Sequence, residues 1–211
     1  MTLDNLTMNN FKDALIAGNR SNCSMIIKKL LKDQVPIIDI YEQIIKKALY
    51  GIGDSWESGK ISVATEHLAS AVVEGILNVL LSNTITKDKS GQTAVLACVE
   101  SERHQIGLKM VTDVFEKNGW NTFYLGSGVP AEELIWFIKE KKPDVLALSI
   151  TLTYSIQYLV RTINKIHVLF PEQIILIGGQ GLWKGKAELF QFDPTIRYIP
   201  DLYVLDTFFV K

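Results

Sequence analysis

Residues 94–107 read AVLACVESERHQIG, an apolar run followed by a polar loop and then by the start of a helical pattern at Ile106. The apolar run is continuous and does not alternate, which indicates a strand buried on both faces, as in a parallel sheet. A buried strand that leads through a short loop into a helix is the basic unit of an α/β fold. This stretch therefore predicts the architecture of the segment around it.

The same strand-to-helix order repeats towards the C-terminus. Further strands are predicted at 122–125, 145–150 and 174–177, and helices at 106–118, 131–140 and 156–169. This alternation predicts a doubly wound parallel sheet of Rossmann-like or flavodoxin-like type, with helices on both faces. Ligands of such sheets bind at the carboxyl ends of the strands. We therefore expect the site in the loops after Val99, Leu125, Ile150 and Ile177.

The N-terminal part has a different pattern. Apolar residues recur at helical spacing from Leu6 to Ser82, with breaks at Gly18-Asn19, at Gln34-Val35-Pro36 and at Glu57-Ser58-Gly59-Lys60. These breaks predict a bundle of four helices. The stretch 82–92 is polar and separates the two patterns, so we predict a helical domain over 1–87 and an α/β domain over 88–211.

Composition excludes some classes of function. The chain has 22 Lys and Arg against 23 Asp and Glu, which leaves no positive excess for direct nucleic-acid binding. Cys23 and Cys98 lack metal-ligand spacing and lie in apolar surroundings, so we expect two buried free thiols in a reducing, cytoplasmic compartment. Neither a secretion leader nor an uninterrupted apolar stretch of about 18 residues is evident, so we expect no export and no membrane span.

The first loop carries the pattern Glu102-x-His104-x-x-Gly107 where a dinucleotide-binding fold would have its glycine-rich turn. A receiver domain would need an aspartate where the third strand ends, and Ser149 stands there instead. A carboxylate beside a histidine can orient the ring of a metal ligand, and a glycine leaves room for a bulky group against the helix. Taken alone, a loop histidine is more often an ordinary surface residue, so both interpretations remain open at this point.

Three loops together carry a more specific pattern. Glu102-x-His104-x-x-Gly107, Ser149-x-Thr151 and Gly178-Gly179 resemble the three-part signature of cobalamin-binding domains. The resemblance implies that His104 is the lower axial ligand of cobalt and replaces the cofactor's own benzimidazole. It also implies that the loops after the third and fourth strands admit the nucleotide tail, and that the helical bundle caps the corrin's upper face. The commonest form of the motif begins with Asp rather than Glu.

Glu at that position is similar to one branch of the family, the cobalamin-dependent light-sensing regulators. Trp56, followed after nine residues by Glu66-His67, matches that branch's second pattern. The resemblance implies that these residues lie beside the upper ligand, an adenosyl or methyl group, with His67 as an optional upper ligand of cobalt. Well-described members often have a histidine directly after the tryptophan, where this chain has Glu57. Light-driven ligation by a second histidine would therefore depend on His67.

Two functions of different classes follow from these patterns. The preferred one is a free-standing sensor of adenosylcobalamin or methylcobalamin that signals to a protein partner, in transcription regulation, or changes its own oligomeric state. We expect no DNA-reading domain before the first helix, which begins near Asn5. The alternative is the corrinoid shuttle of a methyltransferase system, and a third option is a degenerate domain that binds nothing. Other prominent side chains have structural interpretations: Trp120 and Trp136 as packing residues, and His167 as a helix-terminal residue.

Overall fold

The computed structural model describes residues 3–81, 86–183, 186–191 and 193–209. The chain divides into two compact units, residues 1–84 and 85–211. Each unit has its own core of buried apolar residues.

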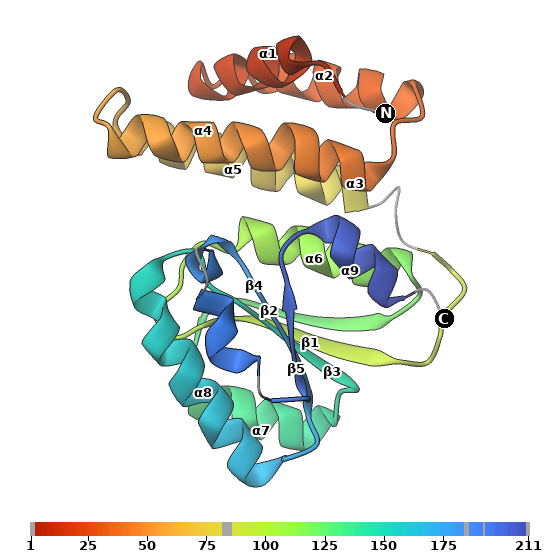
Figure 1. The fold of residues 1–211 in the computed structure, drawn as a ribbon. Helices are drawn as coiled ribbons and strands as arrows, with labels where there is room; N and C mark the ends of the chain where they lie inside the picture. The colour runs from red at the N-terminus through yellow and green to blue at the C-terminus, as the bar shows by residue number, and fades with distance from the viewer. Residues whose placement is uncertain (1–2, 82–85, 184–185, 192, 210–211) are drawn as a thin grey trace. The chain divides into compact units, whose positions relative to one another are not determined.

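The first unit is a helical bundle (Figure 1). Asp4 and Asn19 cap the first two helices, since their side chains accept hydrogen bonds from the backbone N–H groups of Thr7 and Asn22. The third helix changes from α to π geometry and back to α. The four predicted helices are confirmed as α1 (Asn5–Ile16), α2 (Arg20–Lys32), the continuous series α3 (Ile37–Asp39), η1 (Ile40–Ile45) and α4 (Lys46–Glu57), and α5 (Val63–Leu81).

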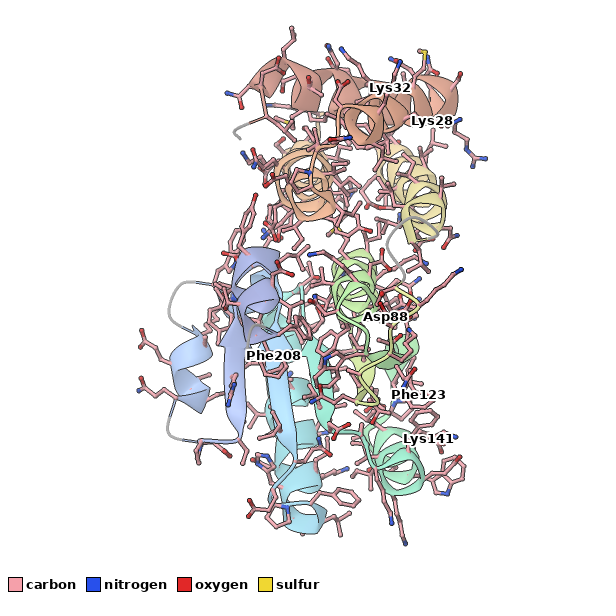
Figure 2. All side chains as sticks on the ribbon, turned by 90° about the vertical axis from the view of Figure 1, so that its right-hand side faces the viewer. Lys28, Lys32, Asp88, Phe123, Lys141 and Phe208 are labelled. Carbon is pink, nitrogen blue, oxygen red and sulfur yellow. The ribbon has the colours of Figure 1, made fainter. Side chains whose placement is uncertain are left out.

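Helix α5 is the most apolar element of the bundle. Contrary to our expectation, its length and composition would by themselves allow it to cross a membrane. Six of its residues are buried in the bundle: Ala69, Val72, Val73, Ile76, Leu77 and Leu80. The helix also carries two glutamates, so a role as the core helix of the bundle accounts for its composition. Helix α2 is more polar: the side chains of Lys28 and Lys32 on it are exposed to solvent (Figure 2).

The second unit contains a five-stranded parallel sheet in the order β2-β1-β3-β4-β5. Helices α6 and α9 lie on one face and α7 and α8 on the other (Figure 1). The doubly wound prediction is confirmed. The strands are β1 (Thr93–Val99), β2 (Asn121–Val129), β3 (Val145–Ser149), β4 (Ile174–Gly178) and β5 (Ile196–Ile199), and the helices are α6 (Ile106–Lys117), α7 (Ala131–Lys141), α8 (Ile156–Leu169) and α9 (Leu202–Phe208).

Two parts of this unit differ from the prediction. Strand β2 continues to Val129, beyond the predicted end at Leu125, because Gly126 and Gly128 adopt positive φ angles and let the strand stay paired through an irregular register. The last strand and helix, β5 and α9, were not predicted. Strand β5 has only four residues, with Arg197 among them, which is too short and too polar for a clear periodicity.

The two packing tryptophans of the prediction have different environments. Trp120 is buried and contacts Phe115 edge to face, with ring centroids 5.2 Å apart, as expected. Trp136 is 62% exposed, so its assignment as a packing residue was wrong. The buried face of α7 carries Leu134 and Ile138. Trp136 lies midway between them in the sequence and therefore points to the opposite side of the helix. At the end of α7, Nζ of Lys141 lies 5.6 Å from the centre of the Phe123 ring, and both residues are labelled in Figure 2.

Candidate functional site

The sheet topology brings the predicted loops together. Cys98 near the end of β1 pairs with Ser149 at the end of β3, and Ser149 pairs with Gly178 at the end of β4. The loops that follow these three strands therefore leave the sheet at one edge, side by side. This is the carboxyl edge, where ligands of parallel sheets bind.

Glu102 is the central residue of this edge. Its side chain is fully buried, and each of its carboxylate oxygens is engaged. Oε1 lies 2.5 Å from Nδ1 of His104 and accepts a hydrogen bond from the backbone N–H of His104 at 2.9 Å. Oε2 accepts hydrogen bonds from the backbone N–H groups of Thr151 at 2.7 Å and Leu152 at 3.0 Å. One carboxylate thus joins the loop after β1 to the loop after β3.

The environment keeps Glu102 ionised. Burial raises the pKa of this carboxyl group, but the hydrogen bonds from His104, Leu152 and Thr151 outweigh burial and lower the pKa to about 2. An ionised carboxylate only accepts hydrogen bonds, so the ring proton of a neutral His104 resides on Nδ1. The ring is half exposed, with 50% of its surface accessible to solvent. This arrangement assigns Nε2 as the nitrogen that would meet a metal ion.

Cys98 lies close to this histidine without acting as a competing ligand. Its Sγ is 3.6 Å from the carbonyl oxygen of His104. Burial, together with the Glu102 carboxylate, raises the pKa of the thiol to about 12. The sulfur therefore stays protonated at neutral pH, and only a thiolate is a good metal ligand.

The glycines of the predicted site differ in what they do. At Gly107 an added Cβ would meet no atom within 4 Å, so the protein's own packing does not require glycine there. Gly179 has a φ of +103°, and an added Cβ would lie 2.1 Å from the carbonyl oxygen of Ile150. At Gly178 an added Cβ would lie 3.1 Å from the carbonyl oxygen of Ile199. An added side chain would thus meet open space at Gly107, whereas the backbone itself accounts for Gly179.

Three residues of this edge were not singled out from the sequence. Leu152 contributes its backbone N–H to Glu102. Ser155 is fully buried, and its hydroxyl accepts a hydrogen bond from the hydroxyl of Ser101 at 3.0 Å. Ser155 lies in the 3-10 turn that precedes α8, so this contact also joins the two loops. No sequence pattern marks these residues, because their partners are distant in the chain.

The bundle holds the remaining candidates at one end of the α4–α5 hairpin. Trp56 lies in the last turn of α4 and is 47% exposed, and Glu66 and His67 lie near the start of α5. The connecting turn is tight: Gly59 has a φ of +71°, and Lys60 N–H donates to the carbonyl oxygen of Ser55 at 2.8 Å. The tryptophan and the Glu-His pair therefore lie at the same end of the hairpin.

A hydrogen-bonded series orients His67. Its Nδ1 lies 2.6 Å from Oε2 of Glu66, and Oε1 of Glu66 accepts a hydrogen bond from the hydroxyl of Ser70 at 2.8 Å. His67 is 75% exposed, so the ring is available to a ligand. Ser70 was missed in the sequence, although its position four residues after Glu66 on a helix is a recognisable signal. Each unit therefore contains an exposed imidazole whose Nδ1 faces a carboxylate.

Comparisons with known proteins agree with this arrangement. One model described as B12 binding domain matches residues 92–193, and a second model with the same description matches residues 7–81. The HTH-type transcriptional repressor CarH of Myxococcus xanthus is 28% identical over 154 residues, which cover 72% of this chain and 48% of the relative. The methanol–corrinoid protein of Methanosarcina barkeri is 36% identical over 90 residues, 41% of this chain and 34% of the relative.

The chain spans about half or less of the length of these two curated relatives. A solved structure of the Methanosarcina barkeri monomethylamine corrinoid protein covers 98% of both chains with a TM-score of 0.83, at 18% sequence identity. This likeness shows that the two proteins share the fold of helical bundle and parallel sheet.

Proposed function

We propose, since the chain belongs to the family of B12-binding domain proteins, that it is a cobalamin-dependent sensor that signals to a protein partner. The cobalamin is held with His104 as the lower axial ligand of cobalt. We infer a cytoplasmic location from the two buried free thiols, Cys23 and Cys98.

The residues of the carboxyl edge fit this cofactor. Imidazole nitrogen is a good cobalt donor, and Glu102 holds the ring of His104 in one tautomer and one orientation. Gly107 supplies open space at the start of α6 for a bulky group. Ser149, Thr151, Gly178 and Gly179 are small residues around the adjoining loops, and we assign them to the cofactor's nucleotide tail.

The observation that carries the sensor interpretation is the oriented imidazole of the bundle. Ser70, Glu66 and His67 form a series that holds an exposed ring at the end of the hairpin that also carries Trp56. Bound cobalamin supplies a cobalt–carbon bond that light can break. Trp56, Glu66 and His67 are the residues of the bundle that would meet the group bound to cobalt, and His67 would be the optional second nitrogen ligand. A relative named as a transcriptional repressor supports a regulator as the partner.

The second candidate is a corrinoid shuttle that carries a methyl group between methyltransferases. It is favoured by the 36% identity to a methanol–corrinoid protein. In that case the same His104 and Glu102 would hold the cofactor, and the bundle would open to a methyltransferase rather than to a regulator. The two candidates differ in the response to light and in the partner.

Absorption spectroscopy and size-exclusion chromatography separate the two functions. Protein reconstituted with adenosylcobalamin or methylcobalamin is measured in the dark and after green light. A sensor gives a light-dependent spectrum together with a change in oligomeric state or in binding to a regulator. Identical chromatographic profiles, together with methyl transfer to a thiol or a folate by a companion enzyme, would instead establish the shuttle.

A further inference from the structure

A cavity of about 410 Å³ lies in the sheet unit at the edge opposite the cofactor loops. Its lining residues stand at the amino ends of the strands: Gln92 before β1, Trp120 before β2, Asp144 before β3, and Arg197 as the second residue of β5. The cofactor loops follow the carboxyl ends of the same strands. This amino-edge cavity is therefore separated from them by a strand length, about 17 Å for five residues.

One wall of the amino-edge cavity is aromatic. Trp120, Phe208 and Phe209 pack against one another, with ring centroids 6.1 Å apart for Trp120 and Phe208 and 5.8 Å apart for Trp120 and Phe209. Phe208, labelled in Figure 2, and Phe209 come from the end of α9 and the residue after it. Aromatic walls with a few polar groups are typical of sites for small planar ligands.

The polar groups of the cavity carry both signs of charge. The guanidinium of Arg197 lies 5.6 Å from the centre of the Phe208 ring, and among the described residues it forms no ion pair. Oδ2 of Asp144 accepts hydrogen bonds from the backbone N–H of Thr93 at 2.7 Å and from its hydroxyl at 3.1 Å. Within the described part of the chain, Oδ1 of Asp144 and the side-chain amide of Gln92 have no hydrogen-bond partner. A ligand could engage all three groups.

The spacing of the charges selects the kind of ligand. Strand β4 lies between β3 and β5, and the register places Arg197 level with Ala147. The backbones that carry Asp144 and Arg197 are therefore about 10 Å apart across the sheet and about 10 Å apart along the strands. A ligand that meets both needs an anionic group at one end and N–H donors at the other, with a planar ring for the aromatic wall. Guanidinium groups pair well with phosphate, and carboxylates accept N–H groups in pairs.

We propose that the amino-edge cavity binds a purine nucleoside monophosphate whose base presents two adjacent N–H donors, as guanine does. The base lies against the wall of Trp120, Phe208 and Phe209, with its N–H groups towards Asp144 and the Gln92 amide. The phosphate pairs with Arg197. The site is independent of cobalamin, because it lies at the other edge of the sheet.

Calorimetric titration of the full chain with GMP tests this assignment, with guanosine and AMP as comparison ligands. Guanosine lacks the phosphate, and the base of AMP lacks the paired N–H edge that meets a carboxylate. We expect saturable binding of GMP and at least tenfold weaker binding of guanosine. Arg197→Gln should abolish this difference in affinity. Asp144→Asn should weaken GMP binding about tenfold, while AMP binding should change little.

Arg161→Gln is the matched control, because it removes an exposed guanidinium on α8, away from the cavity. Asp144→Asn keeps an oxygen that can accept the hydrogen bonds from Thr93, and thermal melting confirms that each variant is folded. Absence of saturable GMP binding to the unmodified chain up to millimolar concentration, or equal effects of Arg197→Gln and Arg161→Gln, would overturn the proposal. Cobalamin titration of the same variants should be unchanged, so failure of the nucleotide site and failure of the cofactor site are distinguishable.

Discussion

The carboxylate of Glu102 accepts a hydrogen bond at 2.7 Å from the backbone N–H of Thr151, although the two residues are 49 positions apart in the chain. The same carboxylate holds the ring of His104. The orientation of the candidate cobalt ligand is therefore coupled to the loop that we assign to the nucleotide tail. The coupling consists of hydrogen bonds within the protein itself, so the site is preorganised.

His104→Ala should remove the lower axial ligand. We expect weaker cobalamin binding and loss of the absorption spectrum typical of histidine-ligated cobalt, measured by titration with hydroxocobalamin. His167→Ala is the matched control, since it removes an imidazole near the end of α8 that contacts Asp193 and Thr195. If the spectrum and the affinity of His104→Ala equal those of the unmodified chain, His104 is not the ligand.

Glu102→Asp should separate the two tasks of the carboxylate. Aspartate keeps the charge but is one methylene shorter, so it cannot reach His104 and the loop at Thr151 and Leu152 simultaneously. Loss of an orienting partner typically lowers metal affinity about 10–100-fold, and we expect an effect of that size on cobalamin binding. An Asp variant with unchanged affinity would show that the shared contact has no role in binding.

Acid should destabilise the folded chain through Glu102. Its pKa is about 2 in the folded protein against an ordinary value of 4.5, so its contribution is complete above pH 4.5 and disappears as the pH falls towards 2. The difference corresponds to about 3 kcal/mol. Urea unfolding at pH 7 and at pH 3.5 measures the effect. Glu102→Gln should lose less unfolding free energy between these two pH values than the unmodified chain. Equal pH dependence in both proteins would contradict this assignment.

Two glycine variants should have opposite effects. Gly107→Ala adds a methyl group in open space within α6, so the fold should be unchanged or stabilised by about 0.5 kcal/mol, while cobalamin binding weakens. Gly179→Ala forces a positive φ and a contact with the carbonyl oxygen of Ile150, so it should lower the melting temperature markedly. Melting curves without cofactor, followed by cobalamin titration, distinguish the two. If Gly107→Ala binds cobalamin as tightly as the unmodified chain does, Gly107 is not part of the cofactor site.

Ser70→Ala should loosen the orientation of His67, because it removes the hydrogen bond to Glu66. In the sensor interpretation, the dark spectrum of bound adenosylcobalamin stays unchanged, while the illuminated form changes in the same direction as in His67→Ala. Spectra recorded before and after green light provide the measurement. Identical illuminated spectra in the unmodified chain and in both variants would exclude His67 from the response to light.

Much of this protein is determined by local sequence. Continuous apolar runs such as 94–99 and helical spacing from Leu6 onward specify strands and helices, because each pattern acts over a few neighbouring residues. The contact between Glu102 and His104 is also local, since only Arg103 separates the two residues in the chain. The order of buried strands and helices then leaves a doubly wound parallel sheet as the simplest arrangement.

Tertiary structure alone decided the rest. The second half of the Glu102 contact, the reason for glycine at 179 and the burial of Ser155 all depend on loops that only the folded sheet brings together. The short strand β5 forms because β4 offers it a hydrogen-bonding edge, although its own four residues carry little signal. Exposure of Trp136 follows from which face of α7 meets the sheet. These features depend on partners distant in the chain, and local patterns carry no information about such partners.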